Sequence, residues 1–215
     1  KHFATGYEKL CLHRENGFVS AALIIQPLGW GRWASFRPGQ AQITAILLGE
    51  PNLLQGLFKA LPGFVWAIEL TAIDPRYSPN FFRSDVFVLA SAQSYTIGVH
   101  SRTRFDDYWG GRPKNLRANI RRYGNRLKKD FAAPSLKWVT EPDDITSGVE
   151  RYGKLESSGW KGAAGSAISP DNVQGAFYSE VMRRFAEQGQ AIVYEYCIAD
   201  CLAASRLIIE NDTLA

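Results

Sequence analysis

Residues 155–200 read LESSGWKGAAGSAISPDNVQGAFYSEVMRRFAEQGQAIVYEYCIAD, and this stretch is the most informative part of the chain. A W-K-G sequence opens a run of small residues over 159–169, which is typical of a loop. An amphipathic helix is expected over 170–188, and Gly189 is placed to end it. Two apolar segments, 190–198 and 202–210, flank a turn at Ala199-Asp200 and predict a β-hairpin.

The longest expected helix lies upstream, over 105–131. Leu116, Ile120, Tyr123 and Leu127 recur at spacings of 4, 3 and 4, which makes an apolar stripe along one helix face. Pro113 is expected in or near the first turn of this helix. A strand over 136–139 and a helix over 142–158 are expected between this long helix and the W-K-G sequence.

The N-terminal half begins with a predicted hairpin about Asn16-Gly17, a dipeptide typical of two-residue turns. Gly29 and Gly31 break the strand pattern that follows. The remaining expected elements are strands over 10–12, 18–26, 42–48 and 64–70, a helix over 52–61, a turn and short helix over 74–83, and a hairpin formed by 85–90 and 95–99. This mixture predicts an α/β (α+β) fold with a mixed sheet.

Composition sets broad limits on the class of protein. The chain has 215 residues, 46% of them hydrophobic, with a net charge of +4, so a packed core is expected. No apolar run approaches the roughly 18–20 residues of a membrane span. The start has no signal-peptide plan and no initiator Met, so we expect a soluble, cytoplasmic protein whose true N-terminus lies further upstream. Three cysteines predict neither a disulfide framework nor a metal site.

Basic residues are concentrated in the long helix. Eight Lys or Arg and no acid lie between Arg112 and Lys129. One interpretation is an anion-binding face made by Arg112, Lys114, Arg117 and Arg121. The other is a solvated face of a connecting helix whose apolar stripe packs on the sheet. The helix lacks the aromatic interleaving and the motifs of nucleic-acid binders, so nucleic acid is not the expected partner.

The W-K-G loop supplies the other candidate residues. Trp160 is predicted to line an acceptor pocket and Lys161 to pair with an anionic group, while Glu156 orients an amine or accepts its proton. The alternative is that Trp160 fills the core between the two domains and Glu156 is a surface acid. Phe177, Val181 and Phe185, at i, i+4 and i+8, predict the buried face of the next helix. Tyr178 lies off that stripe and is expected to face the site.

The order of loop, helix and hairpin in 155–200 resembles the GNAT superfamily of acyl-CoA-dependent acyltransferases. It is most similar to the CelD-like, or cellulose-biosynthesis, branch and more distantly to Fem-type peptidyltransferases. Leu23-Ile24-Ile25 and Leu207-Ile208-Ile209 repeat in the second strands of the two hairpins. The resemblance therefore implies tandem GNAT-like domains, the first truncated at its N-terminus and the second at its C-terminus. The implied boundaries are 1–102, a basic connecting helix over 103–134, and 135–215.

This resemblance implies transfer of an acyl group from acetyl-CoA or another acyl-CoA to an amine or hydroxyl, on a small molecule, a sugar or a cell-envelope precursor. GNAT enzymes hold the CoA pyrophosphate on backbone amides at a helix N-terminus. That turn is expected beyond Ala215, and its counterpart in the first half, Leu48–Leu53 (LGEPNL), is a poor anion cradle. We therefore expect these 215 residues alone to be inactive. The alternatives are a Fem-type aminoacyl-tRNA-dependent transferase and a non-catalytic nucleic-acid-binding or scaffold module.

Overall fold

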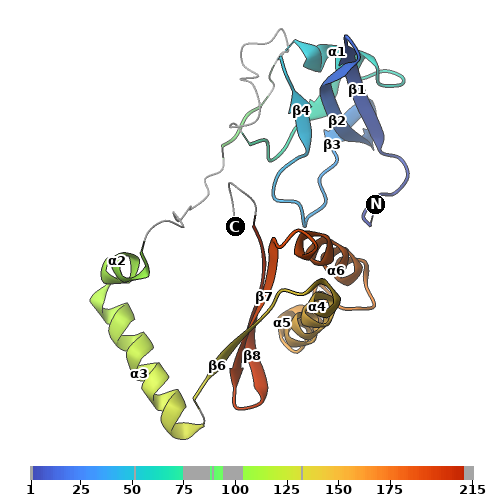
Figure 1. Cartoon of the computed structure of the whole chain (residues 1–215). Helices are drawn as coiled ribbons and strands as arrows, with labels where there is room; N and C mark the ends of the chain where they lie inside the picture. The colour runs from blue at the N-terminus through green and yellow to red at the C-terminus, as the bar shows by residue number, and fades with distance from the viewer. Residues whose placement is uncertain are drawn as a thin grey trace. The chain divides into compact units, whose positions relative to one another are not determined.

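The structure is a computed structural model that describes residues 2–50, 52–74, 88, 90–93, 104–131 and 133–210. The chain divides into two compact units, Phe3–Thr96 and Ile97–Ala215 (Figure 1), and each is described by itself. Both combine helices with a β-sheet, so the mixed α/β class predicted from the sequence is confirmed. The predicted tandem arrangement and the domain boundaries stay predictions.

The predicted N-terminal hairpin is confirmed. β1 (Lys9–Glu15) and β2 (Phe18–Gly29) pair antiparallel. Asn16 and Gly17 join them with φ values of 51° and 83°. Positive φ at both central positions is what a tight two-residue turn needs, and Asn-Gly adopts it at low cost. Alternate residues of β2 (Ala21, Leu23 and Ile25) are fully buried.

Unit 1 contains one strand that the sequence pattern missed. β3 (Arg32–Ser35) pairs antiparallel with β2 through a turn in which Trp30 and Gly31 take φ values of 54° and 71°. Gly29 and Gly31, which break the strand pattern in the sequence, therefore lie at a turn that continues the sheet into β3. β4 (Ile46–Leu48) pairs with β2, and β5 (Ala67–Glu69) runs parallel to β3, so both strands are shorter than predicted.

The core of unit 1 forms between this sheet and α1 (Leu53–Lys59), which confirms the predicted short helix. Leu54 and Leu57 of α1 are buried with Leu23 and Ile25 of β2. The short helix predicted at 74–83 and the hairpin predicted at 85–99 lie outside the described residues, except for the few positions named above.

Unit 2 has an antiparallel sheet in the order β6-β7-β8, made by β6 (Ser135–Val139), β7 (Ala191–Ile198) and β8 (Cys201–Ile209). The predicted turn at Ala199-Asp200 is confirmed, with Ala199 at a φ of 51°. Three helices lie between β6 and β7 in sequence: α4 (Pro142–Ser157), α5 (Trp160–Ala163) and α6 (Val173–Ala186). Helices α4 and α6 pack on the sheet through a core made by Ile145, Val149, Met182, Ala186, Ala191 and Val193.

The predicted single helix over 105–131 is wrong. It is divided into α2 (Phe105–Gly110) and α3 (Lys114–Asp130). Pro113, at φ −50° and ψ 136°, is extended rather than helical and lies just before α3. Proline has no amide hydrogen to continue the upstream helix, so it separates the two helices. No residue of α3 is buried, so the expectation that its apolar stripe packs on the sheet is also wrong.

The predicted buried face of α6 is rotated. Gly175, Met182 and Ala186 are its buried residues, whereas Phe177, Val181 and Phe185 are half-buried. A Cβ on Gly175 would lie 1.8 Å from the Ser169 carbonyl oxygen. This close approach explains why a small residue, and not the aromatic Phe177, takes the innermost position.

Candidate functional site

Glu156, at the end of α4, is the centre of a polar cluster that contains two predicted site residues. Its carboxylate accepts hydrogen bonds from Lys161 Nζ at 2.5 Å, from the Ile168 amide at 2.8 Å and from the Tyr152 hydroxyl at 3.2 Å. The Glu156 side chain is only 12% exposed. The structure thus brings Glu156 and Lys161 together as an ion pair at the start of the 159–168 loop, and the bond from the Ile168 amide ties the end of the loop to the same carboxylate.

Two further side chains fix the same loop. Ser157 donates its hydroxyl to the Ile168 carbonyl at 3.3 Å. Asn172 caps α6 by accepting from the Gly175 amide at 2.9 Å, and its side-chain amide donates to the Ala167 carbonyl at 2.8 Å. The loop predicted from its Gly, Ala and Ser content is therefore a tightly bonded segment, and it includes the short helix α5.

Glycines allow this segment to lie directly against its neighbours. A Cβ on Gly162 would be 1.9 Å from the Ser157 carbonyl oxygen, and one on Gly153 would be 2.8 Å from that of Ile168. Both neighbours are backbone atoms, which have little room to move. The small residues of the W-K-G sequence thus serve close backbone packing, as does Gly175 on α6.

Trp160 and Tyr178 occupy different environments beside this cluster. Trp160 begins α5 and is 76% exposed, so it does not fill the core of unit 2, and the alternative that it lies in a core between the two domains stays a prediction. Tyr178 is half-buried and packs against the core of unit 2. Burial raises the pKa of Tyr178, and the negative charge of Glu156 raises it further. The four side chains Glu156, Lys161, Tyr178 and Tyr152 are therefore electrostatically linked.

The ionisation of Glu156 bears on its predicted role as a base. Burial alone would raise its pKa, but the hydrogen bonds from the Ile168 amide, Lys161 and Tyr152 together outweigh burial and lower it. The pKa of Lys161 is raised, chiefly by its hydrogen bond to Glu156. A carboxylate that accepts three hydrogen bonds is well stabilised in its charged form and is a weak proton acceptor. This geometry favours a positioning role for Glu156.

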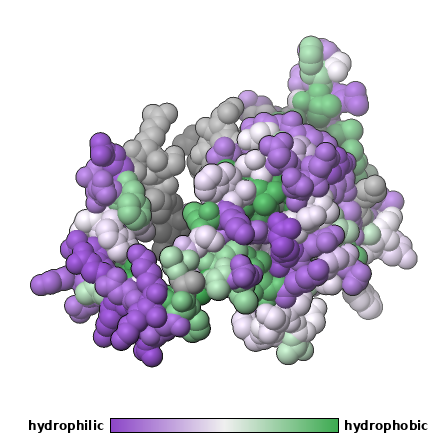
Figure 2. Space-filling model, turned by 60° about the horizontal axis from the view of Figure 1, so that its bottom comes forward, coloured by the Kyte–Doolittle hydropathy of each residue, from purple (hydrophilic) through white to green (hydrophobic). Residues whose placement is uncertain are grey.

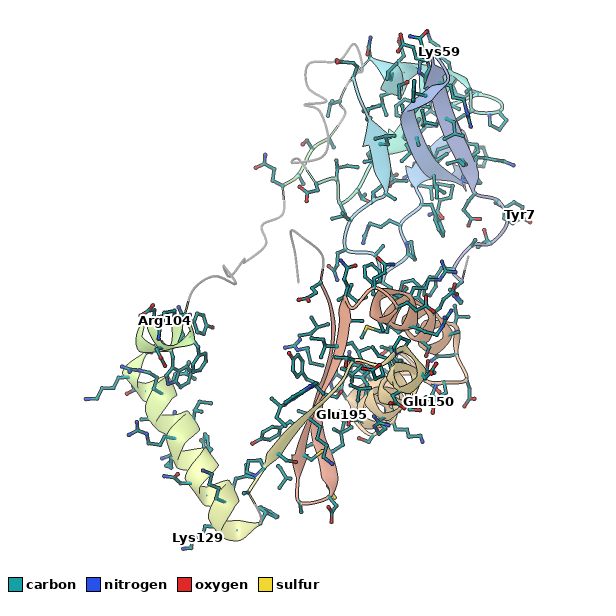
Figure 3. The ribbon with its side chains drawn as sticks, viewed as in Figure 1. Tyr7, Lys59, Arg104, Lys129, Glu150 and Glu195 are labelled. Atoms are coloured by element: carbon teal, nitrogen blue, oxygen red, sulfur yellow. The ribbon has the colours of Figure 1, made fainter. Side chains whose placement is uncertain are left out.

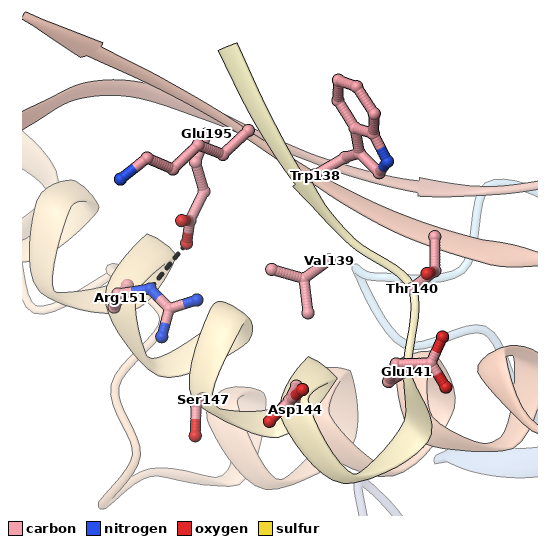
Figure 4. A pocket seen from close by; sticks show the side chains of 9 residues that line it. Trp138, Val139, Thr140, Glu141, Asp144, Ser147, Arg151 and Glu195 are labelled. Atoms are coloured by element: carbon pink, nitrogen blue, oxygen red, sulfur yellow. Dashed lines mark hydrogen bonds and ion pairs between the residues drawn. The ribbon is translucent and has the colours of Figure 1, made fainter. Parts of the chain in front are cut away.

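A second polar feature, between β6, α4 and β7, was not predicted from the sequence. Glu195 of β7 and Arg151 of α4 form an ion pair at 2.6 Å at one end of a cavity of about 490 Å³ (Figure 4). The Glu195 side chain is only 9% exposed. Ala191, Val193 and Cys197 are buried at alternate positions of the same strand. Glu195 falls in the same alternation of every second residue, so the strand pattern of 191–197 could have predicted that this acid lies on the inner face of the sheet.

The cavity is lined mostly by polar side chains, together with Trp138 and Val139 of β6. Figure 4 shows Asp144 and Ser147 of α4 on the same side as Arg151, with Thr140 and Glu141 at the end of β6. None of the predicted site residues lines this cavity.

The predicted anion-binding residues lie on the helices before β6. Lys114, Arg117 and Arg121 line a notch of about 560 Å³ between α2 and α3, together with Trp109 and Ile120. Arg112 instead places its guanidinium over the Tyr108 ring, 4.4 Å from the ring centroid. Three of the four predicted cations therefore gather at one place, which is not the Glu156 cluster.

The stretch predicted to be a poor cradle for the CoA pyrophosphate lies between β4 and the first turn of α1, and its fit to that group stays a prediction. Glu50 is exposed just before α1, a helix of seven residues whose N-cap Asn52 makes no side-chain capping hydrogen bond. Within the described ranges, no three His, Cys, Asp or Glu side chains gather as a metal site. No helix in the described part of the chain is long and apolar enough to cross a membrane.

Comparison with known proteins connects this geometry with a family. Residues 114–215 match the family model described as an acetyltransferase (GNAT) domain. The matched stretch begins at the first residue of α3 and includes the sheet of unit 2 and its helices α3 to α6, but not α2. Searches of curated proteins and of solved structures found no match. The family match supports the resemblance to the GNAT superfamily inferred from residues 155–200.

Proposed function

We propose that unit 2 belongs to an acyltransferase that moves an acyl group from acyl-CoA to an amine or hydroxyl acceptor. The observation that carries this proposal is the strand, helices and antiparallel hairpin β6-α4-α5-α6-β7-β8, which lie inside the stretch that matches the acetyltransferase (GNAT) domain. In such a transfer the thioester C–S bond breaks and a C–N or C–O bond forms. The acceptor loses a proton and the CoA sulfur gains one.

In this proposal Trp160 and Tyr178 present the acceptor with an aromatic surface. Trp160 is exposed on α5, where it is free to contact a bound molecule. Tyr178 stays protonated at neutral pH because burial and the charge of Glu156 raise its pKa, so its hydroxyl is available to donate a hydrogen bond. The positive charge of Lys161 is balanced by the Glu156 carboxylate, so Lys161 serves to fix α5 and not to attract a distant anion.

Glu156 has two candidate roles in the proposal. As a base it would take the acceptor proton, but its lowered pKa and three donors oppose this role. As a positioning residue it accepts hydrogen bonds from Lys161 and from the Ile168 amide and thereby fixes the position of α5, which carries Trp160. We propose the second role, in which the acceptor proton leaves through water or through a side chain other than Glu156.

The finer assignments are also proposals. The CelD-like branch and a sugar or cell-envelope acceptor are supported by the resemblance of residues 155–200. An acceptor with both an apolar surface and an amine or hydroxyl would suit an exposed Trp beside a Tyr hydroxyl.

The test is a thiol-release assay with acetyl-CoA and a set of amine and hydroxyl acceptors, using the natural protein that carries this sequence at its full length. We expect release of CoA only when an acceptor is present, and a fall of about tenfold or more in Trp160→Ala, which corresponds to roughly 1.4 kcal/mol. Trp30→Ala removes a tryptophan that is also highly exposed, in unit 1, and is the matched control. Equal loss in both variants, or no acceptor-dependent release, would contradict the proposal.

A further inference from the structure

Helix α3 is amphipathic, yet its apolar stripe is not buried within the described part of the chain. None of its 17 residues is buried. Leu116, Ile120 and Tyr123 are 43%, 53% and 53% exposed. At 3.6 residues per turn, these three and Leu127 fall within an arc of about 60°. Figure 2 shows the hydrophilic surface of this helix with hydrophobic patches beside it.

Cations border this apolar stripe on both sides. On the helix projection, Arg117 and Lys128 flank one edge, and Arg126 flanks the other together with Asp130, the acid with which it pairs. α3 carries seven Lys or Arg (Lys114, Arg117, Arg121, Arg122, Arg126, Lys128 and Lys129) and a single acid, Asp130. In the part of the chain that the structure describes, only Arg126 of these seven has an acidic partner, which is Asp130.

Helix α2 extends the same surface with aromatic rings. Phe105 and Trp109 are stacked, with centroids 5.9 Å apart, and Phe105 is exposed. Trp109 lies at the notch beside Lys114, Arg117 and Arg121. Figure 3 shows the side chains that project along these two helices from Arg104 to Lys129.

We propose that α2 and α3 form a docking surface that lies on an anionic phospholipid membrane. A helix with a polar, Lys/Arg-rich face and an opposite face of Leu, Ile and aromatic residues binds in the plane of the membrane interface. At roughly 25 Å, α3 is long enough to lie along the surface. The apolar stripe enters the acyl boundary while the flanking Arg and Lys stems reach back to lipid phosphates.

Two other occupants fit the observations less well. A second copy of α3 would bring seven cations against seven, with one acid on each helix, which is strongly repulsive. Nucleic acid would use the cations, but its binding is carried by phosphate contacts and leaves the exposed apolar stripe without a role. Only a surface that is both anionic and apolar underneath uses both faces.

The test is co-sedimentation of the full chain with vesicles of phosphatidylcholine alone and of phosphatidylcholine with about one third phosphatidylglycerol, whose negative charge supplies the attraction. We expect binding to the anionic vesicles and little to the neutral ones, with affinity that falls as salt screens the charge. The double variant Arg117→Gln/Arg121→Gln should weaken binding about 30-fold, at roughly 1 kcal/mol for each cation. Lys9→Gln/Lys59→Gln removes the same charge from exposed positions of unit 1 and should have little effect.

The apolar stripe separates the possible partners. Leu116→Gln/Ile120→Gln should weaken vesicle binding by about tenfold or more, because apolar burial is lost, and should leave the unfolding midpoint unchanged. Vesicle binding that is insensitive to this pair would overturn the proposal. So would binding to a single-stranded oligonucleotide that is tighter than binding to vesicles and depends only on the cations. A lowered unfolding midpoint would also overturn it, because the stripe would then be packed within the protein itself.

Discussion

At the scale of single residues, Glu156 shows how one carboxylate organises a segment that is rich in small side chains. Its neighbours Gly162 and Gly153 provide close backbone packing but no polar anchoring. Glu156 supplies that anchoring through Lys161, Ile168 and Tyr152. The W-K-G sequence therefore forms the helix α5, which Gly162 packs against α4 and Lys161 joins to Glu156, and which leaves Trp160 exposed.

The first prediction concerns the pH dependence of this anchor. The pKa of Glu156 is lowered from its ordinary value of 4.5, so its stabilising contribution is complete above pH 4.5 and is lost as the pH falls through the lower folded value. The amide proton shift of Ile168, followed by NMR, should therefore inflect below pH 4.5. In Glu156→Gln the inflection should vanish, whereas Glu150→Gln on the same helix should keep it.

The pH dependence has an upper limit as well. The pKa of Lys161 is raised from its ordinary value of 10.5, so its contribution is complete below that pH and is lost above the raised value. The anchor should thus be constant between about pH 4.5 and 10.5. An Ile168 inflection at pH 5 or above, in the range where a catalytic base would titrate, would instead support the role of Glu156 as a base.

The second prediction concerns close packing. Gly162→Ala places a Cβ at 1.9 Å from a backbone oxygen and should destabilise unit 2 by about 1–3 kcal/mol, the usual cost of overpacking. Gly159→Ala is the matched control, since its Cβ would lie at 3.6 Å from the nearest atom, an ordinary contact. Urea unfolding combined with hydrogen exchange over residues 142–186 measures both. Equal effects of the two variants would show that α5 does not pack as described.

At the scale of secondary-structure elements, local sequence predicted what local geometry controls. Asn16-Gly17 and Ala199-Asp200 form the predicted turns, because a tight hairpin turn depends on its own residues. The helical stripe did not predict the buried face of α6, because that face is set by how closely Gly175 approaches Ser169. This contact joins α6 to the loop before it, and the spacing of hydrophobic residues along the helix does not predict it.

The third prediction tests how α4 and β7 are joined. Arg151→Met should destabilise unit 2 by about 1–3 kcal/mol, less than a fully buried pair would cost, because Arg151 itself is 43% exposed. The loss arises because the buried Glu195 carboxylate is left without its partner. Arg183→Met breaks the exposed pair with Glu187 on α6 and should cost about 0.5 kcal/mol or less. Hydrogen exchange of the β7 amides measures the loss of stability in both variants. Comparable losses would mean that the Glu195–Arg151 pair stabilises unit 2 no more than an exposed ion pair does.

At the scale of the whole molecule, the sequence predicted the candidate site only in part. Glu156 and Lys161 were predicted and lie together, because they are close in sequence and joined by a short loop. Glu195 and Arg151 were missed, since a pair 44 positions apart needs the register of β7 against α4 to be known. The basic residues were found from composition, but their exposure on α3 required the structure.

The central claim is that this chain carries part of an acyl-transfer site, and the most direct measurement is mass spectrometry of the acceptor. The natural full-length protein would be incubated with isotopically labelled acetyl-CoA and the acceptor that gives the highest thiol release. We predict that the acceptor gains one labelled acetyl group for each CoA released, and that Trp160→Ala lowers both together while its unfolding midpoint is unchanged. Release of CoA without acetylated acceptor, or labelled acceptor formed equally well by Trp160→Ala, would contradict the account.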